Sequence, residues 1–242
     1  MYVNYQLKYE TRGRHVFVPT DECRAYGERL LNECLQHVDL PDYHFHYTPG
    51  GHVAALHRHI QNQFFFRIDV RRFFYSISRN RVAAALRHFG IPDPRGRAKW
   101  SCVANPYGPG YVLPIGFVQS PMLASMVVLR SPITAAINNA RDRGAFVSMY
   151  FDDFIGSASN LTLLREVYDR FLYACEQAAL PINDAKVVEP GPSAIAFNCD
   201  LREGFSAVTD ERVAKFYSQP RSAASAESFE SYRERVSSRN VL

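Results

Sequence analysis

Long hydrophobic runs are missing from this sequence: no stretch approaches the roughly 20 apolar residues that a membrane-spanning helix needs. The first residues, MYVNYQLKYETRGRH, are polar and contain no apolar core, so we expect neither a signal peptide nor a membrane partner. Low-complexity tracts and internal repeats are also absent from the sequence. Because 47% of the residues are hydrophobic and 13% aromatic, the 242 residues can build one large domain, or one domain with an appendage.

Paired cysteines are missing as well. The five cysteines are dispersed and form no CxxC motif, which predicts free thiols in a reducing compartment, the cytoplasm, and argues against a zinc cassette. Five histidines lie between His44 and His59, but they have no acid or thiol partners nearby in the sequence, so a zinc site is not favoured. The formal net charge of +4 is compatible with a nucleic-acid partner without being diagnostic of one.

The order of predicted elements indicates an α+β fold. Between 64 and 201 the pattern reads strand, helix, loop, helix, two strands, helix and two strands, which predicts an antiparallel ferredoxin-like sheet with two helices on one face. Before it we expect a short strand at 16–18 and helices at 20–38 and 52–62. The segment 91–116 is rich in proline and glycine and is expected to be irregular, with at most a small hairpin.

The stretch VSMYFDDFIGSAS places two adjacent acids, Asp152 and Asp153, among strand-forming residues. An unpaired ionised carboxylate on a buried strand face is costly, so a hairpin turn that lets both acids project into a cleft is expected. A third acid, Asp69, ends the strand-like FFFRID. Three clustered carboxylates would raise one another's pKa, and a hard divalent cation such as Mg²⁺ or Mn²⁺ would relieve the repulsion. Taken alone, the doublet is more typical of a solvated turn than of a metal site.

Four segments in a fixed order place these acids in a wider pattern. They are DVRRFF from Asp69, LPIGFVQSPMLAS from Leu113, YFDD from Tyr150 and LPINDAKVV from Leu180. In order and spacing they resemble reverse transcriptases, especially bacterial retron-like and group II intron-like enzymes, while GFVQSP resembles the bacterial defence-associated members. The resemblance spans 9–201. It implies a right-hand polymerase with fingers at 1–63, a palm at 64–201 that includes the irregular insertion, and a reduced thumb or helical tail at 202–242.

The resemblance assigns catalytic roles residue by residue. In that family the first aspartate and the hairpin pair bind two metal ions, which here implies Asp69, Asp152 and Asp153 as ligands of two Mg²⁺ ions, with Mn²⁺ as a substitute. The lysine of the last segment is thought to protonate the departing pyrophosphate, which implies Lys186. The aromatic residue five positions after the first aspartate excludes a ribose 2′-hydroxyl, which implies Phe74.

Further positions are implied around the nucleotide and the primer. Arg12 and Arg14, on an expected fingers hairpin, are candidate triphosphate contacts because arginine binds phosphate bidentately. Gln119 is expected beside the nucleotide, and Tyr150 and Phe151 beside the primer end.

Two further positions mark how closely the family pattern is followed. His59 matches the histidine that ends the helix before the catalytic strand in retron-type enzymes. Ile115 departs from the pattern, because LPIG replaces the usual LPQG and removes a glutamine that positions nucleotide and template.

The resulting hypothesis is an RNA-directed DNA polymerase that works by two-metal phosphoryl transfer in bacterial antiviral defence. Its expected partners are an RNA template or structured non-coding RNA, deoxynucleoside triphosphates, the DNA product, and a second copy or partner protein that compensates for the short thumb. Ile115 and the small thumb leave untemplated, repeat or protein-primed DNA synthesis open. An RNA polymerase is disfavoured by Phe74, and a catalytically inactive scaffold that binds RNA or a partner is a further alternative.

Overall fold

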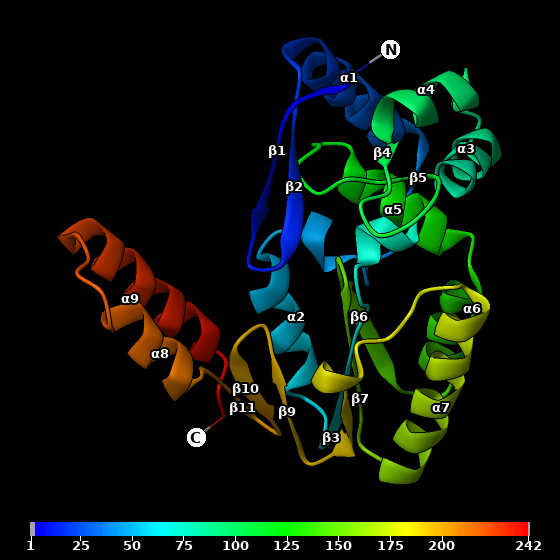
Figure 1. The fold of residues 1–242 in the computed structure, drawn as a ribbon. Coiled ribbons are helices and arrows are strands. Elements are labelled where there is room, and N and C mark those ends of the chain that lie inside the picture. Colours follow the sequence, from blue (N-terminus) through cyan, green and yellow to red (C-terminus); the bar gives the residue numbers. More distant parts are fainter. Residues whose placement is uncertain (1–2, 242) are drawn as a thin grey trace. The chain divides into compact units, whose positions relative to one another are not determined.

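The computed structural model describes residues 3–241, which separate into two compact units that are described individually below (Figure 1). Unit 1 contains the chain up to Pro41 together with Val70–Thr134 and Ala174–Pro181. Unit 2 contains Asp42–Asp69, Ala135–Tyr173 and the chain from Ile182 onward. Each unit is therefore assembled from segments that are far apart in the sequence.

Unit 1 combines a long hairpin with a group of helices. Strands β1 (Tyr5–Thr11) and β2 (Arg14–Pro19) pair antiparallel. Their turn uses Arg12 and Gly13 at φ angles of 52° and 70°, the left-handed pair that a tight hairpin requires. The other elements of this unit are α1 (Asp21–His37), the 3₁₀ turn η2 (Phe73–Ser76), α3 (Arg79–His88), α4 (Pro94–Ser101), β4 (Val103–Ala104), β5 (Tyr111–Val112) and α5 (Ser120–Leu129).

Side-chain caps fix where the helices of unit 1 begin. The Thr20 hydroxyl accepts a hydrogen bond from the Cys23 amide at the start of α1, and the Ser78 hydroxyl accepts one from the Arg81 amide at the start of α3. The segment 91–116 differs from the expected irregular structure, because it contains helix α4. That helix forms because Asp93 caps the Gly96 amide at 3.1 Å and a proline occupies its first turn, where the missing N–H has no cost.

Helix α5 carries apolar residues on all sides, and almost all of its residues are buried. It ends at Leu129, and a new helix, α6 (Pro132–Asp142), begins at Pro132, because a proline cannot continue the helix before it. Within residues 3–241 no single helix is long and apolar enough to cross a membrane, and α5 and α6 meet that test only as a bent pair.

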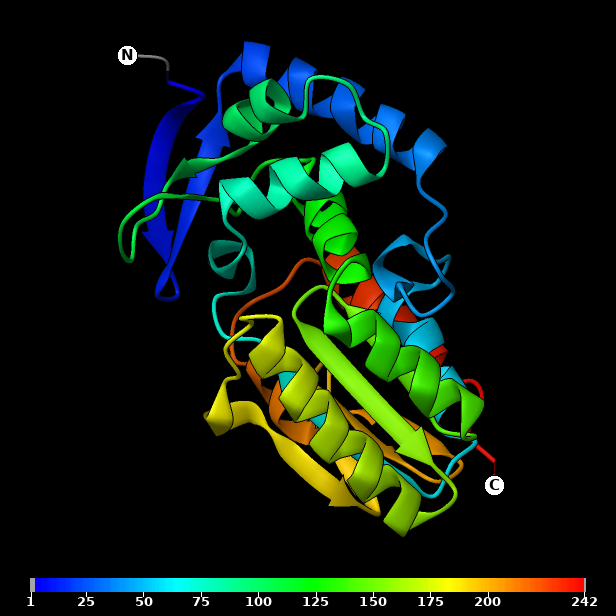
Figure 2. The same cartoon turned by 90° about the vertical axis from the view of Figure 1, so that its right-hand side faces the viewer.

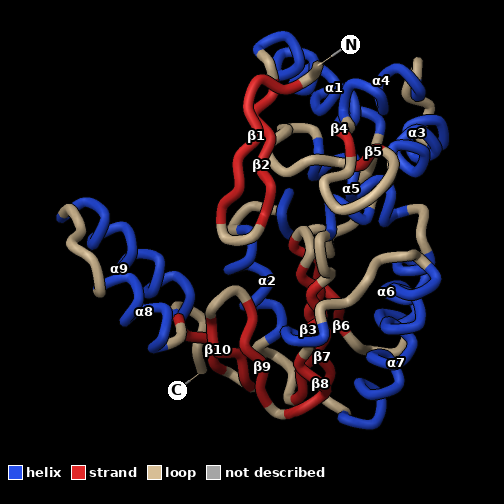
Figure 3. Tube along the Cα trace, viewed as in Figure 1, coloured by secondary structure: helices blue, strands red, loops and turns tan. Residues whose placement is uncertain are grey.

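The centre of unit 2 is a four-stranded antiparallel sheet in the order β6-β7-β3-β8. Figure 2 shows α6 and α7 (Leu161–Gln177) lying across one face of this sheet, and its strands are drawn red in Figure 3. This is the α+β arrangement that the sequence predicts, with the strand that precedes Asp69 in an interior position. The four strands are β3 (Phe64–Asp69), β6 (Phe146–Tyr150), β7 (Asp153–Ala158) and β8 (Val188–Gly191).

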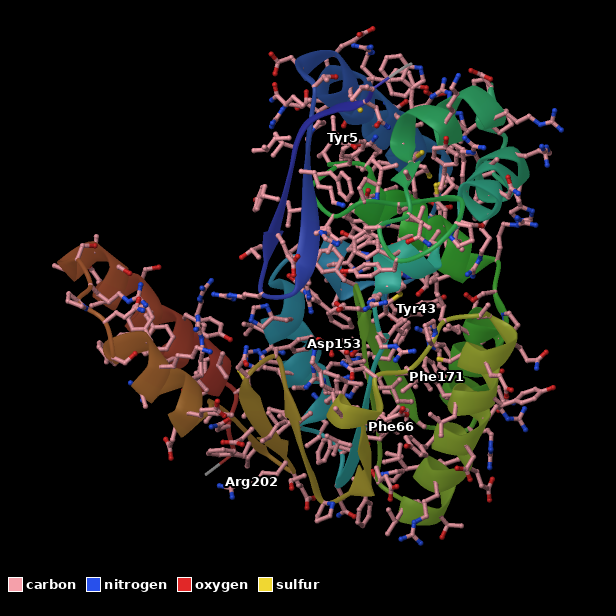
Figure 4. All side chains as sticks on the ribbon, in the orientation of Figure 1. Tyr5, Tyr43, Phe66, Asp153, Phe171 and Arg202 are labelled. Carbon is pink, nitrogen blue, oxygen red and sulfur yellow. The ribbon has the colours of Figure 1, made fainter. Side chains whose placement is uncertain are left out.

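Aromatic rings fill the space between the sheet and α7. Phe66 lies 5.3 Å from the Tyr168 ring, and Phe154 lies 4.9 Å from the Phe171 ring (Figure 4 labels Phe66 and Phe171). Phe66 also lies directly over Gly156 of β7, where an added Cβ would sit 2.1 Å from its ring. Because Phe66 is fully buried, its ring has no free space into which it can retreat.

We therefore expect Gly156→Ala to lower the free energy of unfolding by about 1–3 kcal/mol, since overpacking displaces a buried ring. Urea denaturation of the variant and the wild type measures this difference. Gly191→Ala on β8 is the matched control, because a Cβ there would meet its nearest neighbour at an ordinary 3.8 Å. Equal losses in the two variants would contradict the packing described for Phe66.

The opposite face of the sheet packs on a second layer. A shared apolar core joins Phe65 and Ile155 of the sheet to α2 (Gly51–His59) and to a three-stranded sheet in the order β11-β10-β9. The polar tail, expected to be helical near its end, contains a strand and two helices that add to this core. The strands and helices concerned are β9 (Ser193–Ala196), β10 (Cys199–Arg202), β11 (Phe205–Val208), α8 (Asp210–Tyr217) and α9 (Ala223–Ser237).

His59, the last residue of α2, ties that helix to the sheet. It is fully buried, and its two ring nitrogens lie 2.7 Å from the hydroxyls of Ser157 on β7 and Ser148 on β6. Burial lowers the pKa of His59 to about 3, so the ring stays neutral and shares hydrogen bonds with both strands of the hairpin that carries the acidic doublet. His59 is thus a structural support of that hairpin.

Candidate active site

Two of the predicted acids face each other on neighbouring strands. Asp69, the last residue of β3, is the register partner of Asp153, the first residue of β7. Directly opposed residues of an antiparallel pair have Cβ atoms about 4.5–5.5 Å apart, so the carboxylates share one face of the sheet. Asp152 lies in the two-residue turn between β6 and β7, next to Asp153. Figure 4 labels Asp153 at this end of the strands.

An arginine lies between these carboxylates. Arg67 is two residues before Asp69 on β3, so it projects from the same face. Its Nε and Nη2 donate to Asp153 Oδ1 at 2.8 and 2.6 Å, and Nη2 lies 4.0 Å from Asp69 Oδ2. Its Nη1 donates to the Ile195 carbonyl at 3.3 Å. Arg67 is therefore held on three sides and partly neutralises both acids.

Asp69 has its own partners from the segment after α7. Lys186 Nζ lies 3.0 Å from Asp69 Oδ2, and Asn183 Nδ2 donates to Asp69 Oδ1 at 2.7 Å. The backbone N–H of Asn183 also donates to the backbone carbonyl of Asp69 at 2.8 Å. The short turn η3 (Asp184–Lys186) follows directly and brings Lys186 next to Asp69. Lys186, the predicted proton donor, is thus positioned against Asp69.

The electrostatics of the site favour a cation. Burial raises the pKa of Asp153 above its ordinary value, the Arg67 guanidinium opposes that shift, and the Asp69 carboxylate adds to it. Asp69 and Asp153 lie close enough for each carboxylate to disfavour ionisation of the other, which a bound cation would relieve. The donors are all oxygens, the ligands that Mg²⁺ and Mn²⁺ prefer, so the chemistry of this set fits such ions.

In this conformation, nitrogen atoms of protein side chains contact the oxygens of Asp69 and Asp153. Across residues 3–241, no group of three His, Cys, Asp or Glu side chains is arranged to hold a metal ion. The reason is visible at Asp69, whose two oxygens contact Asn183 and Lys186, and at Asp153, whose Oδ1 is taken by Arg67. A divalent ion would have to displace at least one of these nitrogens.

The turn that carries Asp152 is strained and supported from outside the hairpin. Phe151 has a φ of 54°, a left-handed conformation that costs a non-glycine residue about 1–3 kcal/mol. Its amide donates to His46 Nδ1 at 3.4 Å, and the two rings lie 4.7 Å apart. Burial lowers the pKa of His46 to about 4, so its ring stays neutral and can accept that bond. Tyr150 packs beside it, 5.3 Å from the Phe197 ring.

The remaining predicted residues belong to unit 1. Arg12 and Arg14 are exposed at the turn of the β1–β2 hairpin, where both guanidinium groups can reach solvent. Phe74 is half-buried in η2, edge-on to Phe73. Ile115 packs against the apolar cluster around Phe17, and its carbonyl accepts a hydrogen bond from the Phe17 amide at 2.9 Å.

Gln119, expected beside the nucleotide, is buried inside unit 1. Its side chain is 1% exposed, its Nε2 donates to the Ser101 hydroxyl at 3.3 Å, and its Oε1 occupies the space above Gly27. Gln119 thus packs between α1 and the end of α4, where glycine at 27 leaves room for it.

Three residues of the site escaped the sequence-based interpretation: Arg67, Asn183 and His46. Arg67 carried a signal, since it alternates with Asp69 on a strand whose other residues are apolar. Asn183 lies within LPINDAKVV, where only the lysine was singled out. For His46 the sequence contains no local signal, because its contact with Phe151 spans 105 positions.

Removing the charge of Arg67 should reveal how strongly the acids depend on it. We expect Arg67→Met to lower the free energy of unfolding by about 2 kcal/mol, because two nearly buried carboxylates lose their cation. Added Mg²⁺ should then raise the melting temperature more in this variant than in the wild type. Arg143→Met, which breaks the exposed pair with Glu166, is the control and should cost at most about 1 kcal/mol. Identical Mg²⁺ responses of wild type and Arg67→Met would contradict this account.

Together, an antiparallel α+β sheet and opposed carboxylates at the end of two neighbouring strands form the arrangement that the sequence predicts for a polymerase palm. Comparison with family models extends this result: residues 8–191 match the model described as reverse transcriptase (RNA-dependent DNA polymerase). The chain belongs to the reverse transcriptase family, whose description is that of a nucleotidyltransferase, the class that the sequence predicts.

Solved structures share the fold at low sequence identity. One is apo telomerase from Candida tropicalis, truncated from its C-terminal domain, with a TM-score of 0.52, 12% identity, and coverage of 74% of this chain and 43% of that chain. Another is the foamy viral protease-reverse transcriptase in complex with an RNA/DNA hybrid, with a TM-score of 0.51, 16% identity, and coverage of 80% and 23%. This chain therefore spans less than half the length of either, and the likeness confirms the predicted fold. The comparison with curated proteins gave no match.

Proposed function

We propose that the protein is an RNA-directed DNA polymerase whose reaction centre is formed by Asp69, Asp152 and Asp153. The observation that carries the proposal is the register pairing of Asp69 with Asp153, which holds carboxylates from two strands at one end of the sheet. Family membership supports the reaction type. Two Mg²⁺ ions, or Mn²⁺ in their place, would be held by these three acids and would supply charge neutralisation and activation of the primer 3′-hydroxyl.

The chain's own side chains have separate roles in this proposal. Arg67 and Lys186 neutralise the acids before substrate binds and are displaced or shared when substrate arrives. Lys186 has 42% of its side chain exposed, so it can turn from Asp69 toward a triphosphate and donate a proton to the leaving pyrophosphate. His46 holds the strained turn at Phe151 and so positions Asp152, while Tyr150 and Phe151 offer rings to the primer end.

In unit 1 we assign substrate roles to three side chains. Arg12 and Arg14 are exposed and are proposed to bind the triphosphate. Phe74 is proposed to exclude the ribose 2′-hydroxyl, so Phe74→Ala should raise ribonucleotide incorporation relative to deoxynucleotide incorporation by roughly tenfold. An unchanged ratio would remove that role from Phe74.

Primer extension on an RNA template with deoxynucleoside triphosphates and Mg²⁺ tests the function directly. The wild type should copy the template, and the double variant Asp152→Ala/Asp153→Ala should show no extension above background. Activity of the double variant equal to that of the wild type would refute the assignment. Sequencing the product decides between templated copying and the untemplated, repeat or protein-primed synthesis that Ile115 suggests.

The biological setting extends this proposal. Motif resemblance supports a defence-associated subtype and an antiviral role. The dispersed cysteines support a cytoplasmic location. The short thumb supports a structured RNA, a second copy or a partner protein as binding partner. All five cysteines are free and buried, which supports a reducing environment.

A further inference from the structure

A basic groove runs between α3 and α4 in unit 1; we call it the α3–α4 groove. The two helices lie side by side in Figures 1 and 2. The groove has a volume of about 660 Å³. Its lining consists of Arg79, Asn80, Ala83, Ala84, Arg87, Arg95, Ala98 and Lys99.

Four cations surround this groove, and no acid lines it. Within residues 3–241, none of these four side chains forms an ion pair or donates a hydrogen bond to the protein. The segment 79–99 contains six arginines or lysines and one aspartate, a formal charge of +5, whereas the whole chain carries +4. The positive charge of the protein is therefore concentrated here, where mutual repulsion favours an anionic partner.

The floor of the groove is shaped for close approach. Ala83, Ala84 and Ala98 are small, so the long side chains around them enclose a space rather than fill it. Arg79 and Arg87 are eight residues apart on α3, about 12 Å along the axis at 1.5 Å per residue. The cations thus form an extended row, which suits the repeated charges of a phosphodiester chain better than one compact anion.

An adjoining hollow of about 310 Å³ shares Arg79 and Lys99 with the groove and is less polar. Tyr5 and Tyr111 line it, and residue Tyr111 is 48% exposed. The Arg79 guanidinium lies 4.3 Å from the centre of that ring. An exposed aromatic ring and an arginine plane beside a cationic row are the combination on which unstacked bases of single strands bind.

We propose that the α3–α4 groove and this hollow bind a single-stranded nucleic-acid segment. Its phosphates contact Arg79, Arg87, Arg95 and Lys99, and a base rests against Tyr111. This site lies entirely within unit 1 and uses none of the residues assigned to the reaction centre. Its occupancy therefore does not depend on polymerase activity.

Fluorescence anisotropy with a labelled single-stranded RNA of about 20 nucleotides, without nucleotides, tests the proposal over a range of KCl concentrations. The variant Arg87→Gln/Arg95→Gln removes two exposed cations of the groove. Its affinity should fall at least about tenfold near 0.1 M KCl, and the slope of log K against log [KCl] should become shallower by about 1.4, at about 0.7 for each lost contact. The control Arg24→Gln/Arg29→Gln removes two exposed cations of α1 and should leave both quantities unchanged.

Three further arms complete the experiment. The charge-preserving Arg87→Lys/Arg95→Lys should keep the wild-type slope, which separates charge from fold. Tyr111→Ala should weaken binding of single strands about fivefold or more and leave duplex binding unchanged. A single-stranded DNA of the same sequence shows whether the groove prefers an RNA or a DNA backbone, and binding of either strand supports the site. Equal affinities and slopes in the groove and control variants would overturn the proposal. So would polyglutamate that displaces the labelled RNA as well as unlabelled RNA does, or a Tyr111→Ala effect as large on duplex binding as on single-strand binding.

Discussion

Replacing Asp69 by asparagine should reduce nucleotide incorporation by at least about a thousandfold, which corresponds to about 4 kcal/mol of transition-state stabilisation. The substitution preserves the size of the side chain and its acceptance of the Asn183 hydrogen bond, but it removes the charge opposite Asp153. Incorporation measured under single-turnover conditions reports the loss in the chemical step.

The matched control for this substitution is Asp169→Asn, which neutralises an exposed aspartate on α7 of the same unit. It should retain the wild-type rate, and both variants should keep a cooperative thermal transition. A rate for Asp69→Asn within about tenfold of the wild type would mean that the transition state does not use this carboxylate.

Replacing His59 by alanine should lower the free energy of unfolding by about 3–5 kcal/mol, the second large effect that we expect. The substitution opens a cavity and leaves the hydroxyls of Ser148 and Ser157 without their shared partner inside the hairpin. Urea denaturation at neutral pH measures the difference. His88→Ala, at an exposed position on α3, should change stability by at most about 0.5 kcal/mol.

His59 also makes a specific contribution to the pH dependence of stability. Its pKa is lowered from the ordinary 6.5 to about 3, so between these values the unfolded chain binds a proton that the folded chain does not. Stability is therefore full above pH 6.5 and falls as the pH drops, by about 2 kcal/mol from this group between pH 7 and 5. His59→Gln should remove that part of the slope, whereas the contribution of His46, whose pKa is about 4, acts in the same direction and remains. An unchanged slope would contradict the burial of a neutral His59.

The sequence predicts the palm well because its signals are local. Aromatic and β-branched residues mark the strands around Asp69 and the doublet. Ser78 caps α3, and Pro132 separates two helices. Each of these signals depends on neighbours within a few positions. The juxtaposition of Asp69 and Asp153 follows once both strands are placed in one sheet. The antiparallel sheet could be predicted in this way, whereas the order of its four strands and the separate three-stranded sheet could not.

What escaped prediction depends on contacts between distant positions. The abundance of proline and glycine around Asp93 concealed a capped helix, and without that helix the α3–α4 groove could not be foreseen. Gln119 followed the family pattern in sequence, yet its burial against Gly27 depends on how two helices pack. Arg67 stood two residues from Asp69, but its two bonds to Asp153 depend on the strand register.

Binding of Mn²⁺, measured by electron paramagnetic resonance with a deoxynucleoside triphosphate present, tests most directly whether carboxylates from β3 and β7 share a cation. The wild type should bind the ion, and Asp69→Asn and Asp153→Asn should each weaken that binding at least about tenfold, because each removes a ligand of the same site. If Asp69→Asn bound Mn²⁺ as tightly as the wild type while Asp153→Asn did not, the two acids would not form one site and the account of the reaction centre would be wrong.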